Sequence, residues 1–318
     1  MQTADREVLE QVADWLGEER RVWLCTVIRT VGSSPRPVGS IVAICEGGRR
    51  IGSVSGGCVE DDLLERLAQG RYSGVSPELI EYGVSAAENE RLGLPCGGRI
   101  VLLLQCLVAA DRVWIGDILK YLQARQCVKR EVDLANGATS LSPLNRFEPL
   151  VVEQDKIEQS FGPQMRLLLV GAGQLASSLA ELALAMDYEV MVTDPRPDLL
   201  DQWAGPEVKL LSGMPDDVAL EYACDASSIV ITLTHDPRID DMALMEALKS
   251  DAWYVGALGS QRTTQQRRQR LRDLDLSAED IERLHAPVGL DIGSKTPIEI
   301  AVAIMAEITA LRRGRLPS

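Results

Sequence analysis

A cysteine beside two glycines is the residue of this sequence best placed to do chemistry. The run 49–62 predicts a strand, then the pair Gly56 and Gly57, and then a helix that begins at Cys58. At a helix N-terminus, the unpaired backbone N–H groups and the positive end of the helix dipole favour a thiolate over a thiol. The glycines also let an anionic ligand approach the backbone. We therefore expect Cys58 to react or to bind a ligand.

A second run of this kind, Cys96, Gly97 and Gly98, lies before an apolar strand. No helix follows Cys96 directly, and Arg99 supplies a positive charge only if the loop folds back. Glycine pairs expose backbone N–H groups, and in such surroundings a thiolate can hold a soft metal or carry a transferable sulfur. We expect both Cys58 and Cys96 to act in this way. The remaining cysteines lie in apolar runs and are expected to be buried structural thiols: Cys25, Cys45, Cys106, Cys127 and Cys224.

A glycine fingerprint in the second half of the chain predicts a nucleotide or pterin-phosphate site. The apolar run 166–170 is followed by Gly171, Gly173 and Ala176 in the pattern G-x-G-x-x-A, which opens a helix. The next strand ends at Asp194, 23 residues after Gly171, where an acid that binds ribose is expected. Backbone N–H groups at the start of the helix would bind phosphate. The alternative is that the glycines only permit close packing of helix and strand.

Two further residues are expected near the carboxyl ends of the same sheet. His235 follows a strand and could be the general acid of a dehydrogenase, or it could be an ordinary loop residue held by Asp236. Arg262 follows a Gly-Ser pair at a helix start, where anions bind in doubly wound folds. The other arginines of that helix are expected to form a solvated face: Arg267, Arg268, Arg270 and Arg272.

Composition narrows the classes of protein to which the chain can belong. Its 318 residues, 46% of them hydrophobic, suffice for two ordinary cores. The net charge of −14 argues against nucleic acid as a partner, because duplex binding depends on neutralising phosphates. No apolar run approaches membrane-spanning length, and the first residues do not resemble a secretion signal, so we expect a cytoplasmic protein without stable membrane insertion. The spacing of the two histidines argues against a structural zinc site, and the odd number of cysteines argues against a disulfide framework.

The elements that would position these residues fall into two domains, and we predict an α/β protein. Residues 1–150 indicate a small α+β domain, with helices at 5–18 and 111–126 and strands at 22–28, 41–45, 51–54, 79–82, 100–105 and 128–134. Periodicity fades between residues 136 and 164, where we place the boundary. In residues 151–318, strands at about 166–170, 188–193, 208–211, 228–234 and 253–257 alternate with helices. This alternation is typical of a Rossmann-like, doubly wound parallel sheet.

Several short motifs follow one another along the chain in a specific order. They are Gly32-Ser33-Ser34-Pro35-Arg36, Gly56-Gly57-Cys58-Val59-Glu60, Cys96-Gly97-Gly98, Thr234-His235-Asp236, the run 254–260, and the run 287–293 with 296–301. Together they resemble the XdhC/CoxI family, the xanthine dehydrogenase accessory factors, from about residue 20 to the C-terminus. The resemblance implies an N-terminal domain joined to a Rossmann-like domain. It also implies a protein that binds molybdenum cofactor, works with a cysteine desulfurase that replaces an oxo ligand by sulfur, and inserts the product into a molybdenum hydroxylase.

The residues of this chain fit such a cargo. Cys58 and Cys96 would contact molybdenum, and backbone N–H groups with Arg36 and Arg262 would donate to the pterin phosphate. We therefore expect a homodimeric chaperone without turnover of its own, whose partners are a molybdenum hydroxylase and a cysteine desulfurase.

Two other functions stay open from the sequence. One is an NAD-dependent dehydrogenase for a small alcohol, hydroxy acid or aldehyde, with His235 as proton donor, and the other is a protein-binding scaffold. If a nicotinamide nucleotide binds, Asp194 should favour NAD over NADP, although Arg196 could accept the extra phosphate.

Overall fold

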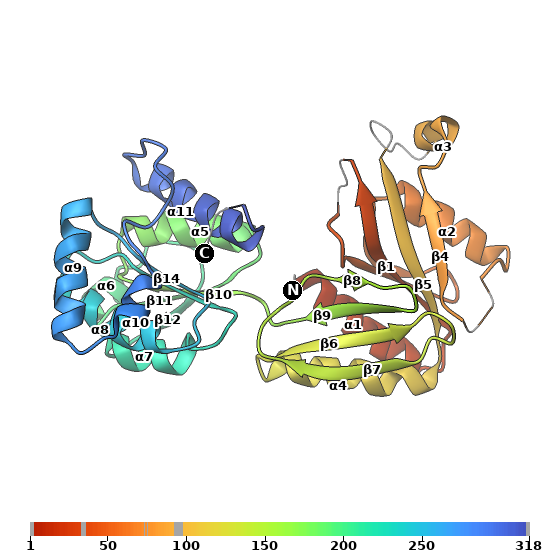
Figure 1. Ribbon diagram of the computed structural model, residues 1–318, viewed down its shortest axis with the longest axis horizontal. Coiled ribbons are helices and arrows are strands. Elements are labelled where there is room, and N and C mark those ends of the chain that lie inside the picture. The colour runs from red at the N-terminus through yellow and green to blue at the C-terminus, as the bar shows by residue number, and fades with distance from the viewer. Residues whose placement is uncertain (1–2, 33–35, 73, 75, 92–97, 316–318) are drawn as a thin grey trace. The chain divides into compact units, whose positions relative to one another are not determined.

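The chain divides after Pro163 into two units, 1–163 and 164–318, each with its own sheets and cores (Figure 1). The computed structural model describes residues 3–32, 36–72, 74, 76–91 and 98–315. Two strands that follow residue 150 pair within the first unit, so that unit extends to the end of the stretch 136–164 in which the sequence pattern places the boundary. The combination of a small first unit and a Rossmann-like second unit confirms the predicted α/β class.

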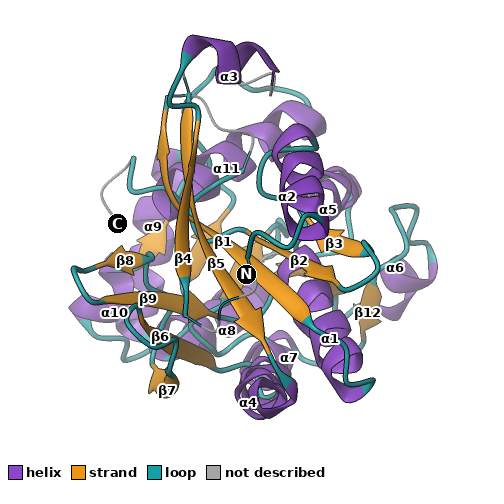
Figure 2. Ribbon diagram, turned by 90° about the vertical axis from the view of Figure 1, so that its right-hand side faces the viewer, coloured by secondary structure: helices purple, strands orange, loops and turns teal. Residues whose placement is uncertain are grey.

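A five-stranded antiparallel sheet lies at the centre of the first unit (Figure 2). Its order is β3-β2-β1-β5-β4, from β1 (Val22–Val31), β2 (Ile41–Cys45), β3 (Arg50–Gly52), β4 (Glu78–Tyr82) and β5 (Arg99–Leu107). The central strands are apolar on both faces because helices and a second sheet cover them. The register pairs Val31 with Arg99, so the motifs that follow β1 and precede β5 begin at the same end of the sheet.

Three helices flank this sheet. The helix α2 (Cys58–Ala68) packs its buried residues Val59 and Leu63 on one face, against β1, β2, β4 and β5. On the other face lie α1 (Thr3–Gly17) and α4 (Arg112–Gln123), whose apolar stripes share one core with β1 and β2. Two shorter elements complete this part of the unit, α3 (Ala86–Arg91) and the 3₁₀ turn η2 (Ala109–Asp111).

A second sheet occupies the region where the sequence periodicity fades. It is antiparallel, in the order β7-β6-β9-β8, and consists of β6 (Cys127–Asp133), β7 (Thr139–Leu144), β8 (Val151–Val152) and β9 (Lys156–Phe161). Of these strands, only β6 is predicted from the sequence. The edge strands β7 and β8 have no buried residues and therefore lack a regular apolar alternation. In β9 the pattern is hidden because two of the buried residues, Gln159 and Ser160, are polar.

A buried arginine joins the two sheets of the first unit. Arg130 of β6 donates to the side-chain oxygens of Gln105 in β5 and Gln159 in β9, and its guanidinium lies 4.5 Å from the ring centre of Trp114. Burial lowers the pKa of Arg130 to about 10. Gln159 in turn donates to the carbonyl of Gly39, 3.0 Å away. The loop before β2, which carries Arg36, is thereby tied to the second sheet.

The second unit is a parallel, doubly wound sheet in the order β12-β11-β10-β13-β14-β15. Its strands are β10 (Arg166–Val170), β11 (Glu189–Thr193), β12 (Lys209–Leu211), β13 (Ser228–Thr232), β14 (Tyr254–Ala257) and β15 (Leu284–His285). The helices are α5 (Gln174–Ala185), α6 (Pro197–Asp201), α7 (Pro215–Tyr222), α8 (Pro237–Lys249), α9 (Gln261–Asp273), α10 (Ala278–Glu282) and α11 (Pro297–Arg312). Figure 1 shows α5 and α11 on one face of the sheet and α7, α8 and α10 on the other. The strand order reverses between β10 and β13, where such folds form a crevice.

Among the described residues, no helix combines the length and the apolar composition that a membrane crossing requires.

Candidate functional site

The thiol of Cys58 lies at an open helix start in the first unit. Cys58 is the first residue of α2 and is exposed. Gly56 and Gly57 precede it with φ of 96° and 144°, values that only glycine adopts readily. A Cβ added at either glycine would meet no described atom within 4 Å. The approach to Cys58 over these two residues is therefore clear.

The backbone N–H groups beside Cys58 already have an anionic partner, the buried carboxylate of Glu60. It accepts hydrogen bonds from the N–H groups of Val54 (2.8 Å), Ser55 (3.0 Å) and Gly57 (3.0 Å) and from the hydroxyls of Ser53 (2.7 Å) and Ser55. Burial by itself would raise the pKa of Glu60, but hydrogen bonds from Ser55, Ser53 and Val54 outweigh it and lower the pKa to about 2. The N–H groups of Gly56 and Gly57 were expected to face a ligand, but in the structure they donate to Ser53 and Glu60. The group that this loop presents to solvent is the Cys58 thiol.

The other predicted residues of the first unit are placed less completely. Cys96 and Gly97 lie outside the described residues. Gly98 is buried beside Gly32: a Cβ added at Gly32 would lie 3.5 Å from the Gly98 Cα atom. Gly32, which follows β1, and Gly98, which precedes β5, therefore lie side by side. Arg36 is half-buried. Among the remaining cysteines, Cys25, Cys45 and Cys127 are buried, and Cys106 and Cys224 are half-buried.

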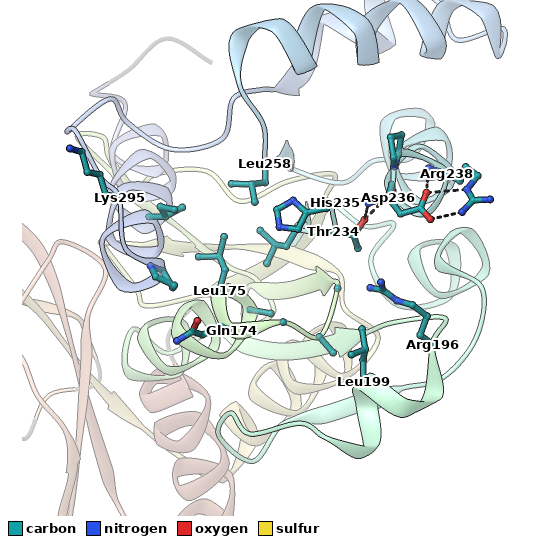
Figure 3. Close-up of a pocket in the computed structure, with 18 residues that line it drawn as sticks. Gln174, Leu175, Arg196, Leu199, Thr234, His235, Asp236, Arg238, Leu258 and Lys295 are labelled. Carbon is teal, nitrogen blue, oxygen red and sulfur yellow. Dashed lines mark hydrogen bonds and ion pairs between the residues drawn. The ribbon is translucent and has the colours of Figure 1, made fainter.

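A cavity of about 840 Å³ lies at the carboxyl ends of the parallel strands in the second unit (Figure 3). The loop between β10 and α5 contributes Gly171 and Gly173, the first turn of α5 contributes Ala176, and the loop between β13 and α8 contributes His235. Further walls come from the loop after β11, the loop after β14, and the segment that leads into α11. The cavity is thus built where the strand order reverses, as expected for a ligand site in this fold.

The two fingerprint glycines have different roles in the structure. Gly171 has φ +115°, and an added Cβ would lie 2.9 Å from the Thr234 Cγ2 atom. Thr234 is itself fixed, because its hydroxyl donates to the Asp240 carboxylate at 2.7 Å. Around Gly173, in contrast, an added Cβ would meet no described atom within 4 Å. Gly171 therefore permits close packing of two loops, and Gly173 leaves room in the cavity.

Asp194 does not present its carboxylate to the cavity. Its side chain is fully buried, and it accepts hydrogen bonds from the N–H groups of Ala172 and Arg196, both at 3.0 Å. The Arg196 guanidinium donates to it twice more, each time at 2.8 Å. Burial alone would raise the pKa of Asp194, but the hydrogen bonds from Arg196 and Ala172 outweigh it and lower the pKa. The residue expected to bind ribose instead binds the backbone of the glycine loop, at Ala172, and the side chain of Arg196.

Basic side chains line both ends of the cavity. Figure 3 shows Arg196 and Arg238 at one end and Lys295 at the other, with His235 between them. Asp236 accepts from the backbone N–H of Arg238 at 3.0 Å and from its guanidinium at 3.1 and 2.7 Å. Asp236, which the alternative interpretation expected to hold His235, therefore binds Arg238. His235 is exposed in the cavity.

The arginines of α9 differ from the solvated face expected for them. Arg262 is exposed and is not among the residues that line the cavity. Arg267 is buried, pairs with Asp240 at 2.8 Å, and donates to the Leu258 carbonyl at 3.0 Å. Arg270 pairs with Asp241 at 2.5 Å. The prediction was wrong for Arg267 and Arg270 because α9 packs against α8 and places these side chains in the contact. It was also wrong for Arg268, which is half-buried and donates to the carbonyls of Ile281 and Leu284.

This buried ion pair connects the loops of the cavity wall. Asp240 binds Thr234 on one side and Arg267 on the other, and Arg267 holds the carbonyl of Leu258, which also lines the cavity. Burial raises the pKa of Asp240 to about 6, against the opposing effects of Thr234 and Arg267. Sequence reasoning missed Asp240, Arg238 and Lys295. The only local signal was Asp236-Pro237 before Arg238, a helix cap followed by a proline at the first helical position.

The described residues offer two places at which a ligand could bind, one in each unit. They include no cluster of three or more histidine, cysteine or acidic side chains that could hold a metal ion. What they offer is one exposed thiol at a helix start and one cavity with basic ends. A soft ligand suits the thiol, and an anionic organic ligand suits the cavity.

Comparisons with known proteins agree with this architecture. The model of the XdhC and CoxI family matches residues 15–83, and the model of the XdhC Rossmann domain matches residues 167–308. The chain is 29% identical to the molybdenum cofactor insertion chaperone PaoD of Escherichia coli over 311 residues, which cover 96% of this chain and 88% of PaoD. It is 25% identical to a probable xanthine dehydrogenase subunit of Bacillus subtilis over 322 residues, 94% of this chain and 95% of that protein.

A solved structure gives the same result. A protein of Bacillus halodurans described as a xanthine dehydrogenase has a TM-score of 0.74 and 27% identity to this chain. The match covers 99% of this chain and 97% of the other. Both units are thus shared with that structure, and both carry a family match in the sequence. The chain belongs to the XdhC and CoxI family.

Proposed function

We propose that this protein is an accessory factor that binds molybdenum cofactor and delivers it to a molybdenum hydroxylase of the xanthine dehydrogenase type. The observation that carries the proposal is its likeness to the molybdenum cofactor insertion chaperone PaoD, which extends over 96% of this chain and therefore over both units. The likeness to a probable xanthine dehydrogenase component points to the same class of client.

The residues of the first unit fit a cargo that contains a soft metal. The cofactor brings its molybdenum already bound to the pterin, so a carrier needs to add few ligands of its own. Cys58 is exposed at a helix start and can supply a sulfur ligand. We propose Cys96 as a second thiol of this kind, and a cysteine desulfurase as the partner that exchanges an oxo ligand of the cargo for sulfur. We further propose that the protein acts as a cytoplasmic homodimer without turnover of its own.

The dehydrogenase alternative has less support than the accessory role. His235 does line the cavity, as a proton donor would. However, the acid expected to hold the NAD ribose, Asp194, is buried and bound by Arg196 and Ala172. The alternative therefore rests on His235 alone.

Replacement of Cys58 tests the proposed contact with molybdenum. Cys58→Ala should fold normally, because the side chain is exposed, but should retain much less cofactor than the wild type. Molybdenum and pterin per protein are measured after purification. Cys224→Ala, at a half-buried thiol of the other unit, is the matched control and should retain cofactor fully. Equal cofactor content in all three proteins would remove Cys58 from the site. Cys96→Ala is expected to weaken retention or sulfur transfer as well.

Deletion of the gene tests the accessory role itself. The client hydroxylase should remain folded but inactive, and metal analysis should find it without cofactor or with cofactor that lacks the terminal sulfur. A client that stays fully active, together with catalytic reduction of NAD by the purified protein and a small alcohol or aldehyde, would replace the accessory role by the dehydrogenase alternative.

A further inference from the structure

The cavity of the second unit has no carboxylate available for a ribose diol at the end of β11. Asp194 is the acid at that position, and all its described partners belong to the protein: Ala172 and Arg196 donate four hydrogen bonds to it, at 2.8 to 3.0 Å. A ribose could reach this carboxylate only by displacing them, and the side chain is fully buried. The Asp194 carboxylate is therefore not available to bind a ribose diol, as the sequence had predicted it to do.

The group that lies at this end of the cavity is the guanidinium of Arg196, which binds the Asp194 carboxylate. Arg196 lines the cavity, and its side chain is 49% exposed. A guanidinium carries five N–H donors, and Asp194 uses one on Nε and one on Nη2. Three donors remain for a ligand. The salt bridge also fixes the plane of the guanidinium, so less side-chain entropy is lost when a ligand binds.

A second guanidinium lies at the same end of the cavity. Arg238 lines the cavity, its side chain is 88% exposed, and Asp236 binds it through Nε and Nη2, with the Asp236 carboxylate between the guanidinium and His235 in Figure 3. Its other N–H donors are not used by Asp236. Hydrogen bonds from Arg238 lower the pKa of Asp236 to about 2, and the charge of Arg196 contributes to the same shift, so the two arginines act on one small region. In each arginine, a carboxylate accepts hydrogen bonds from Nε and Nη2, and the remaining N–H groups can donate to a ligand.

Two such guanidinium groups match a phosphate monoester better than a ribose. A monoester carries close to two negative charges and three acceptor oxygens, and arginine binds such groups through paired N–H donors. In Rossmann-like folds, an arginine near the end of the second strand accommodates the 2′-phosphate of NADP, whereas a free acid binds the diol of NAD. We propose that this cavity selects a ligand with a phosphate monoester, held between Arg196 and Arg238. The expectation from the sequence that NAD binds more tightly than NADP is thereby reversed.

Two ligands carry this chemistry, a 2′-phosphorylated adenine dinucleotide and a phosphorylated pterin. The pterin form of the inference rests on the proposed function, and the nucleotide form stands without it. In both forms the phosphate lies at the Arg196 end and the rest of the molecule extends past Gly173 and His235 toward Lys295, along the cavity.

Calorimetric titration of the full chain with NADP and with NAD tests the nucleotide form. The wild type should bind NADP more tightly by about tenfold or more, because the probes differ only by the monoester. Arg238→Ala should reduce this ratio to about two or three. Arg196→Ala should do the same, although it also leaves Asp194 without its ion pair and is checked for folding. Arg262→Ala is the matched control, since it removes an exposed arginine that does not line the cavity, and should leave the ratio unchanged.

Mass spectrometry of the pterin released from purified protein tests the other form. Phosphorylated pterin should be abundant in the wild type and in Arg262→Ala, and reduced in Arg238→Ala. The proposal is supported if Arg238→Ala reduces either the preference for NADP over NAD or the content of phosphorylated pterin. It is overturned if NAD binds as tightly as NADP while the phosphopterin content is the same in all variants, or if Arg262→Ala has the same effect as Arg238→Ala. Molybdenum retention in Cys58→Ala reports separately on the proposed function, because Cys58 belongs to the other unit.

Discussion

Replacing Gly171 by alanine tests whether this fingerprint glycine serves packing, and Gly173 provides a matched comparison two residues on. An alanine Cβ at 171 would lie 2.9 Å from the Thr234 Cγ2 atom and 3.3 Å from its backbone nitrogen. Thr234 has little freedom to move, since its hydroxyl is bound to Asp240. A φ of +115° is unfavourable for any residue with a Cβ.

The expected loss of stability follows from these contacts. A non-glycine residue in such a backbone conformation costs about 1–3 kcal/mol. Overlap with a fixed methyl group adds about 1–3 kcal/mol, and lower entropy of the unfolded chain offsets about 0.4–1 kcal/mol. The net loss for Gly171→Ala is therefore about 1–5 kcal/mol, centred near about 3 kcal/mol. For a unit of this size, a loss of about 3 kcal/mol corresponds to a fall in Tm of roughly 6–12 °C.

Gly173→Ala should behave differently in the same assay. Gly173 has φ −93° and ψ −178°, which alanine adopts, and no described atom lies within 4 Å of the added Cβ. The loss of a glycine N-cap destabilises the variant and the lower entropy of its unfolded chain stabilises it; both effects are below about 1 kcal/mol and nearly cancel. Thermal unfolding followed by circular dichroism should thus separate the two variants. Equal Tm values, or a less stable Gly173→Ala, would refute the reasoning. Ligand binding should fall in Gly173→Ala, because its methyl group enters the cavity.

Two further predictions concern buried carboxylates. The pKa of Glu60 is lowered from 4.5 to about 2, so its contribution to stability is present above pH 4.5 and is lost as pH falls through 2. Urea unfolding should show Glu60→Gln to be about 1–2 kcal/mol less stable at pH 7 and less affected at pH 2, with Glu65→Gln on the same helix near wild type throughout. The pKa of Asp240 is raised from 3.8 to about 6, so the stability linked to its proton is present below pH 3.8 and is lost as pH rises through 6. Asp240→Asn mimics the protonated state and does not titrate, so its cost should be larger at pH 5, where the wild type still has this stability, than at pH 8, by about 1–2 kcal/mol; an equal cost at both values would contradict the raised pKa, and Asp217→Asn on α7 is the control.

Local sequence patterns were enough to predict most of the fold. The strands β2 and β10 and the start of α2 lie where apolar runs and glycines placed them, because both strands are buried on both faces and read as continuous apolar segments. The glycine fingerprint likewise located the crevice of the second unit. These features depend on residues close together in the chain, which is the information that periodicity contains.

The parts that sequence did not predict depend on contacts between distant residues or on competition for one partner. Asp194 fits the position of a ribose-binding acid, and nothing in the pattern says that Arg196 and Ala172 take up its oxygens. Arg267 has the charge of a surface residue, but its environment is set by Asp240, 27 residues away. The donors beside Cys58 were expected to face a ligand, and Glu60 takes them because the turn folds back on the helix.

The internal carboxylate of Glu60 has a consequence for how the protein would behave between two rounds of delivery. A loop whose N–H groups needed the cargo as their anion would collapse or rearrange each time the cargo departed. Here the chain supplies that anion itself, through hydrogen bonds from Val54, Ser55 and Gly57. These N–H groups are therefore satisfied by the chain itself, without a bound ligand. If the protein has the proposed delivery role, departure of the cargo would not leave them without an acceptor.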